Sequence, residues 1–77
     1  MRHFSDFHHN GDVSIDGYGS EHLGIEDARD EAIDALVEIM PYALTSGDKS
    51  ELAVSVRDED GKPVLKVVVV FEVIVPH

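Results

Sequence analysis

The sequence predicts an α+β domain in the order β-β-α-β-β, with one amphipathic helix packed on a four-stranded antiparallel sheet. Three observations predict this fold: a strand pair at the N-terminal end, a segment of helical period in the middle, and a second strand pair at 51–57 and 64–71. A single helix needs a sheet to cover, and two hairpins supply four short strands. The 77 residues leave room for one small core, so we expect a single domain spanning 1–77.

The first strand pair is predicted on either side of Asn10-Gly11, a dipeptide that favours a tight hairpin turn. Arg2 to His9 forms the first strand, and residues 12–16 alternate polar and apolar as the second. Phe4 and Phe7 have opposite parity, so both cannot face the core of a regular strand. We therefore expect a bulge or an early turn in the first strand. The glycine-rich stretch that follows, 16–20, is predicted to be a loop.

The helix is predicted over about residues 25–46, where the apolar period changes from two to between three and four. Its apolar stripe consists of Ile25, Ala28, Ala32, Leu36, Ile39 and Ala43. Val37 and Leu44 widen that stripe beyond what contact with one sheet requires. Gly47 is well placed to end the helix, whereas Pro41 lacks an N–H and predicts a kink or break.

The second strand pair specifies its own register. A two-residue turn at Asp60-Gly61 places three apolar pairs opposite each other on one face and sets Arg57 opposite Val64 on the other. A four-residue loop would keep the same faces, whereas a three-residue loop would set Lys66 opposite Val54. The apolar pairs are Val56 with Leu65, Val54 with Val67, and Leu52 with Val69. The residues expected to face the helix are Leu52, Val54, Val56, Leu65, Val67, Val69 and Phe71.

The outer face of the last strand predicts an interaction surface. Val68 and Val70 lie there with Lys66 and Glu72, where water is expected because one helix covers only one face of a sheet. An uncovered β-branched run is also an aggregation hazard. The simplest partner is a second copy pairing edges or faces, which makes a homodimer the first expectation and another protein the second. A monomer with a slightly apolar face is the remaining alternative.

Composition excludes several partners. Sixteen acidic residues against six basic ones give a formal net charge of −10, and no run brings two basic residues together. Proteins that bind nucleic acid neutralise phosphates with Lys and Arg, so neither nucleic acid nor an anionic membrane is an expected partner. The chain has no cysteine, a polar N-terminal segment and no long apolar run. We therefore expect a soluble cytoplasmic protein without disulfides.

Candidate chemistry is limited to the histidines. Asp6, His8, His9 and His22 could supply imidazole and carboxylate ligands for a divalent metal, so a metal-binding sensor is an alternative function. Adjacent His8 and His9 point to opposite strand faces, which favours ordinary surface histidines instead. We expect no catalytic residues, no cofactor and no small-molecule substrate, because no nucleophile–base pair or phosphate-binding glycine pattern is present.

The order of several short motifs resembles an uncharacterised family of short, single-domain bacterial proteins. Its members share an Arg-aromatic-Phe first strand, an Asp-x-x-Gly-x-Glu loop, an Ala-rich helix and an Asp-Glu-x-Gly hairpin. The matching positions are Arg2, His3, Phe4, Gly11, Asp12, Asp16, Gly19, Glu21, Glu26, Ala28, Arg29, Glu31, Ala32, Val56, Asp58, Glu59, Gly61 and Leu65. Gly24 stands where the family has an aspartate cap, and Pro41 and the 67–70 valine run depart from the pattern. The resemblance implies a fold and no activity.

Taken together, the residues predict a small acidic domain that acts by protein–protein contact and self-associates. The strand-strand-helix order is also similar to the small partner-binding domain of some antitoxins. The acidic charge would suit masking a basic partner, which is a further alternative based on fold analogy.

Overall fold

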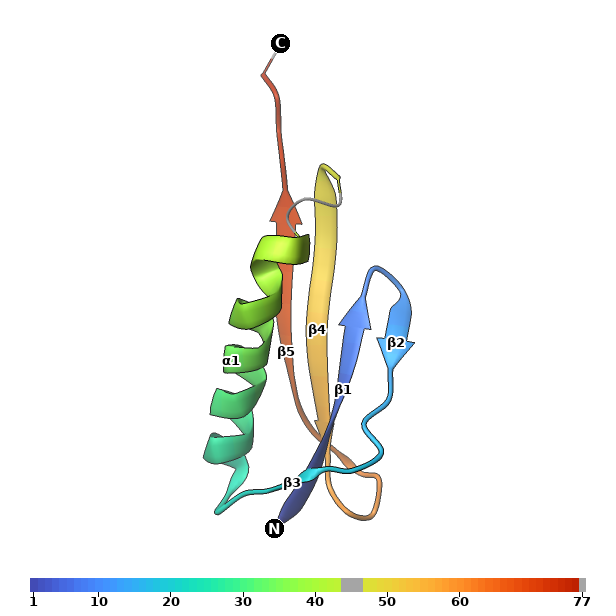
Figure 1. The fold of residues 1–77 in the computed structure, drawn as a ribbon, viewed down its shortest axis with the longest axis vertical. Coiled ribbons are helices and arrows are strands. Elements are labelled where there is room, and N and C mark those ends of the chain that lie inside the picture. The colour runs from blue at the N-terminus through green and yellow to red at the C-terminus, as the bar shows by residue number, and fades with distance from the viewer. Residues whose placement is uncertain (44–46, 77) are drawn as a thin grey trace.

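The computed structural model describes residues 1–43 and 47–76 and confirms the α+β fold. The main strands lie in the order β2-β1-β4-β5, so the two hairpins join through β1 and β4 (Figure 1). These strands are β1 (Arg2–His9), β2 (Asp12–Ser14), β4 (Lys49–Arg57) and β5 (Pro63–Glu72). A fifth strand of two residues, β3 (Ser20–Glu21), pairs with the start of β1 at the end of the segment predicted to be a loop.

The N-terminal hairpin has the predicted two-residue turn. His9 pairs with Asp12, and Asn10 and Gly11 between them both have positive φ, at 49° and 94°. The expected bulge in β1 is wrong, because β1 pairs with β4 in one continuous register. Phe4 and Phe7 lie on opposite faces, and both are half-buried. Phe4 is covered on the outer face by the Arg57 guanidinium, 4.7 Å from its ring centre, so no bulge is needed.

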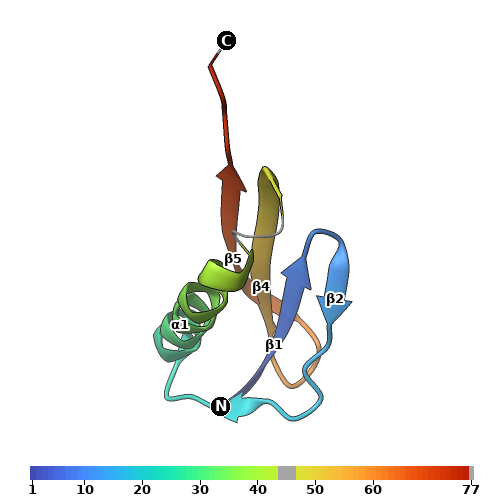
Figure 2. The same cartoon turned by 45° about the horizontal axis from the view of Figure 1, so that its top comes forward.

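The helix α1 (Ile25–Ala43) packs on β4 and β5 rather than over the β1–β2 hairpin (Figure 2). Its buried residues are Ala28, Ala32, Leu36 and Ala43. Of the kink or break predicted at Pro41, the break is wrong, since the helix runs through this residue. Because proline has no N–H to donate, the helix accommodates Pro41 with the loss of one backbone hydrogen bond and continues to Ala43. Positions 44–46, with the predicted helix end and Leu44, lie outside the described residues.

No helix in the described part of the chain is long and apolar enough to cross a membrane.

The C-terminal hairpin has the predicted register from Leu52 to Val56. Leu52 pairs with Val69, Val54 with Val67 and Val56 with Leu65. The loop differs from the prediction, because Arg57 pairs with Pro63 and the register shifts between Val56 and Arg57. The cause is local: the Asp58 carboxylate accepts hydrogen bonds from the backbone N–H groups of Asp60 and Lys62, both at 2.9 Å. A five-residue loop, 58–62, therefore replaces the two-residue turn.

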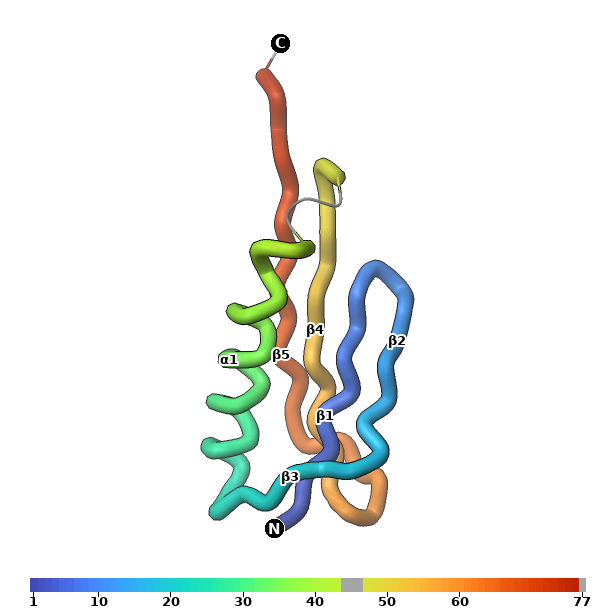
Figure 3. Tube along the Cα trace, viewed as in Figure 1, coloured from blue at the N-terminus to red at the C-terminus, as the bar shows by residue number. Residues whose placement is uncertain are grey.

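The core lies between α1 and the β4–β5 hairpin. Leu52, Val54 and Val56 are buried with the helix residues, and six half-buried apolar residues pack around them. These are Phe7, Ile39, Met40, Leu65, Val67 and Val69. Phe71, which was also predicted to face the helix, is half-buried outside this cluster. The chain continues past β5 as an extended arm, Val73 to Pro76, which projects beyond the rest of the molecule (Figure 3).

Candidate interaction surface

The outer face of β5 is open to solvent over the four residues singled out from the sequence. Lys66, Val68, Val70 and Glu72 are all exposed. Their side chains point away from α1, because their odd-numbered neighbours Leu65, Val67 and Val69 pack against the core. Val68 is 48% exposed and Val70 60% exposed. Among the described residues, no element covers this face.

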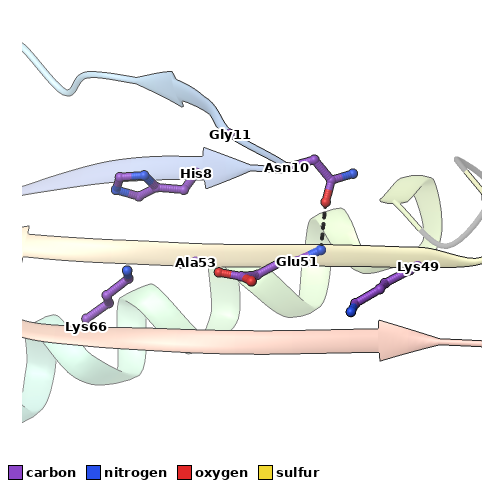
Figure 4. A pocket seen from close by; sticks show the side chains of 7 residues that line it. All are labelled: His8, Asn10, Gly11, Lys49, Glu51, Ala53 and Lys66. Atoms are coloured by element: carbon purple, nitrogen blue, oxygen red, sulfur yellow. Dashed lines mark hydrogen bonds between the residues drawn. The ribbon is translucent and has the colours of Figure 1, made fainter.

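The row of outer-face residues that begins at Val68 crosses the whole sheet and ends at a second exposed valine, Val13. The strand registers align Val13 with His8, His8 with Ala53, and Ala53 with Val68. Val13 is half exposed, at 49%, whereas Ala53 between the strands is only 1% exposed. Ala53 forms the floor of a shallow hollow of about 440 Å³, with longer side chains standing around it (Figure 4). The hollow is lined by His8, Asn10, Gly11, Lys49, Glu51, Ala53 and Lys66.

The charges around this hollow are mixed, which is unusual for so acidic a chain. Lys49 and Lys66 line it together with a single carboxylate, Glu51. Lys49 also lies 3.9 Å from the carboxylate of Glu72, a loose and exposed ion pair. His8 Nε2 lies 3.1 Å from the Ser55 hydroxyl, which holds the imidazole against the sheet. A mixed rim around apolar residues can accept a protein surface without a strong charge preference.

The hairpin tip beside the hollow is fixed to β4. Asn10 donates its backbone N–H to the Glu51 carbonyl at 3.0 Å, and its side-chain oxygen accepts the Glu51 N–H at 2.7 Å. One rim of the hollow is therefore rigid.

At the other end of the same face, Asp6 forms a salt bridge with Arg57. The Arg57 Nε and Nη2 donate to its two carboxylate oxygens at 3.0 and 3.4 Å, and Nη2 also donates to the Asp16 carbonyl at 2.7 Å. Burial opposes ionisation of Asp6, but hydrogen bonds from Arg57 and from the Asp16 N–H outweigh it, so the pKa of Asp6 lies below its ordinary value of 3.8. Asp6 therefore acts as an anchor within the fold.

Asp16 fixes the loop that follows β2. Its carboxylate accepts backbone N–H groups from Gly19, Ser5 and Tyr18, each at 3.0 Å. The Gly19 hydrogen bond is the largest influence on this carboxyl, and with the other two it outweighs burial and lowers the pKa of Asp16 below 3.8. The Asp16 carboxylate therefore joins the loop to the backbone of β1 at Ser5.

The four predicted metal ligands are not brought together. Asp6 and His8 lie on the outer face, His9 lies on the helix face opposite Leu52, and His22 lies in the segment before α1. Among the described residues, no group of three His, Cys, Asp or Glu side chains is positioned to hold a metal ion. The His9 Nε2 is a buried nitrogen without a hydrogen-bond partner in the described part of the chain.

A buried histidine pair is the feature that the sequence did not predict. His3 is 3% exposed and His22 9% exposed, and their Nδ1 atoms lie 3.1 Å apart. His22 Nε2 also contacts the Glu31 carboxylate on α1. The contact between His3 and His22 depends on the pairing of β3 with β1, which sets Ser20 opposite His3. These residues are far apart in the sequence, so a local sequence pattern does not predict the contact. The three side chains therefore connect β1, the segment before α1 and α1 itself.

Comparisons with known proteins give one match. A family model described as a domain of unknown function, DUF6894, matches residues 2–70. No curated protein and no solved structure matches the chain.

Proposed function

We propose that this protein, which belongs to the DUF6894 family, acts by protein–protein contact through the outer face of β5 and associates with itself. The description of the family names no function. One observation carries the proposal: Val68 and Val70 lie exposed side by side on a strand whose opposite face forms the core. β-Branched residues on the solvent face of a strand are normally interrupted by polar ones.

The surroundings of the two valines support a contact surface. Val13 adds a further exposed apolar residue on the same face, beyond Ala53 and His8, and Lys66 and Glu72 border the two valines with opposite charges. Apolar centres with polar rims are typical of protein interfaces. The rest of the chain is strongly acidic, and it favours contact at this near-neutral area over contact elsewhere between two copies.

The test replaces both valines with lysine. We expect the Val68→Lys, Val70→Lys variant to keep its fold, because both side chains already face water. We expect it to lose association, because the contact would bring the two new ammonium groups of each copy next to those of the other. Light scattering measures the solution mass, and circular dichroism with thermal unfolding checks the fold.

A matched control changes two exposed apolar residues far from this face. Tyr18 is 90% exposed and Leu23 98% exposed, and both lie in the loop segments before α1. The Tyr18→Lys, Leu23→Lys variant is expected to associate as the unmodified chain does. An unchanged mass in the β5 variant, or a single-chain mass for the unmodified protein at every concentration, would contradict the proposal.

A further inference from the structure

β5 lies at an open edge of the sheet. Within the described residues it pairs with β4 alone and ends the strand order, and it is ten residues long. The opposite edge, β2, has only three residues. A long apolar edge strand presents unpaired N–H and C=O groups that can pair with another strand. Unlike many natural edges, this one carries no charge between Lys66 and Glu72.

The direction of these free backbone groups follows from the last contact with β4. The Val73 N–H donates to the Asp48 carbonyl at 2.6 Å, so the backbone groups of Val73 point toward β4. In an antiparallel pair the direction alternates with each residue. The groups of Lys66, Val68, Val70 and Glu72 therefore point to the open side. The four residues of β5 whose side chains lie exposed on the outer face are therefore also those whose backbone N–H and C=O groups are unpaired within the described part of the chain.

The charges on β5 select one way for the strand to pair with itself. An antiparallel pairing centred on Val69 sets Lys66 of each copy opposite Glu72 of the other, and Val68 opposite Val70. A shift of the centre to Val68 or Val70 sets Lys66 opposite an apolar residue instead. Opposite charges directly across an antiparallel pair are stabilising. The centred register also joins residues whose backbone groups both point outward, as hydrogen-bonded pairs require.

The same register also pairs the C-terminal arm, residues 73–76, with the second copy. Ile74 and Val75 are 78% and 68% exposed, and the arm extends beyond the end of β4 (Figure 1). In the centred pairing, Ile74 lies opposite Val64 of the second copy, and Val73 opposite Leu65. The arm would continue the strand pair instead of projecting into water.

One side of α1 also becomes covered. Ala35, Ile39 and Tyr42 line a shallow hollow with Phe7 of β1, so that side of the helix faces β1. Ile33 and Val37 lie on the opposite side of the helix, at about 100° per residue, and are 39% and 60% exposed. Figures 1 and 2 both show α1 on the side of β5 away from β1. A two-fold axis through Val69 and perpendicular to the sheet places both helices on one face, with these sides toward each other.

We propose that β5 pairs antiparallel with β5 of a second copy about a two-fold axis at Val69, which joins the two sheets into one. This inference rests on the proposed self-association and specifies its geometry. Association through edges leaves the hollow around Ala53 open on each copy, whereas face-to-face stacking of the outer surfaces would close it.

The absence of cysteine in the chain makes a direct test available. In the centred register the two Val69 residues form a pair without backbone hydrogen bonds between them, with Cα atoms about 4.5 Å apart. A disulfide needs roughly 4.4–6.8 Å. We expect the Val69→Cys variant to form a covalent dimer under mild oxidation, seen by non-reducing electrophoresis. The matched Val67→Cys variant is expected to stay uncrosslinked, since its two copies lie about 13 Å apart along the strands.

A second pair of variants covers the case in which Val69→Cys folds poorly. Lys66→Glu is expected to raise the dimer Kd about tenfold by setting like charges opposite each other twice in each dimer. The double variant Lys66→Glu, Glu72→Lys restores opposite charges and is expected to recover most of that loss. If the Val68, Val70 variant loses association but neither Val69→Cys crosslinking nor charge recovery is seen, self-association stands and this geometry is wrong. A monomeric unmodified chain overturns both.

Discussion

Arg57 and two aspartates decide how the N-terminal third of the chain is attached to the sheet. The guanidinium joins Asp6 on β1 to the backbone of Asp16 and covers the ring of Phe4. Asp16 in turn accepts three backbone N–H groups. Charge-assisted hydrogen bonds of this kind are stronger than neutral ones, and they fix a segment with few apolar contacts.

Stability should fall in acid because of these carboxyls. The pKa values of Asp6 and Asp16 are lowered in the folded chain, so their stabilisation is fully present above their ordinary value of 3.8 and is lost as the pH falls through the lower folded values. We expect Asp16→Asn to unfold more readily near neutral pH and to lose less additional stability below about pH 4 than the unmodified chain. Urea unfolding across pH measures both effects. Exposed Asp12 gives the control, and equal acid sensitivity of Asp12→Asn and Asp16→Asn would contradict the assignment.

At the scale of elements, the loop between β2 and β3 lies close against β1. Gly19 has a φ of 73°, and a side chain there would meet the His3 carbonyl oxygen and side-chain carbons of Arg2 and Phe4, each at 3.0 Å. Gly11 in the β1–β2 turn also has positive φ, but its Cβ would have open space. A substitution at Gly11 would therefore cause backbone strain alone, whereas one at Gly19 would cause backbone strain and a steric clash.

Replacing each glycine with alanine tests this difference. Gly11→Ala is expected to cost about 1 kcal/mol, from the left-handed backbone alone. Gly19→Ala should cost about 1–3 kcal/mol more, because the carbonyl of His3 cannot move without disturbing the pairing of β1. Chemical denaturation of both variants gives the two free energies of unfolding. Equal losses would mean that the loop relaxes away from β1.

For the molecule as a whole, the sheet is larger than the helix that covers it. α1 packs on β4 and β5, while the outer face, the β5 edge and the C-terminal arm have no cover among the described residues. The formal charge of −10 keeps two copies apart at long range. The self-association proposed at β5 would therefore combine short-range apolar and backbone contacts with long-range repulsion.

Salt should strengthen the association. Two chains of charge −10 repel until ions screen them over about 10 Å at 0.1 M salt, whereas exposed Lys66–Glu72 pairs contribute roughly 0–1 kcal/mol each. We expect the dimer Kd to fall several-fold between low and physiological ionic strength, as measured by sedimentation or light scattering. A Kd that rises with salt would show that attraction between charged groups, and not the net repulsion, controls assembly.

The fold class and the register of the C-terminal hairpin could be predicted because they follow from short-range alternation. Leu52, Val54 and Val56 can meet Leu65, Val67 and Val69 in one parity only, since a slip of one residue turns every side chain to the other face. The exposure of Val68 and Val70 follows from the same parity. These features belong to the sequence because neighbouring residues determine them.

Other features were decided only by the tertiary structure. Three of them depend on pairings between distant segments: the place of β5 at the end of the strand order, the contact of His22 with His3, and the contact of Arg57 with Asp6. The five-residue loop at 58–62 is a local exception, because the Asp58 carboxylate accepts hydrogen bonds from the N–H groups of Asp60 and Lys62, which strand alternation does not predict. Sequence periodicity specifies which face a side chain takes, but the choice of neighbouring strand is made by the total burial and hydrogen bonding of the folded chain, which no local pattern contains.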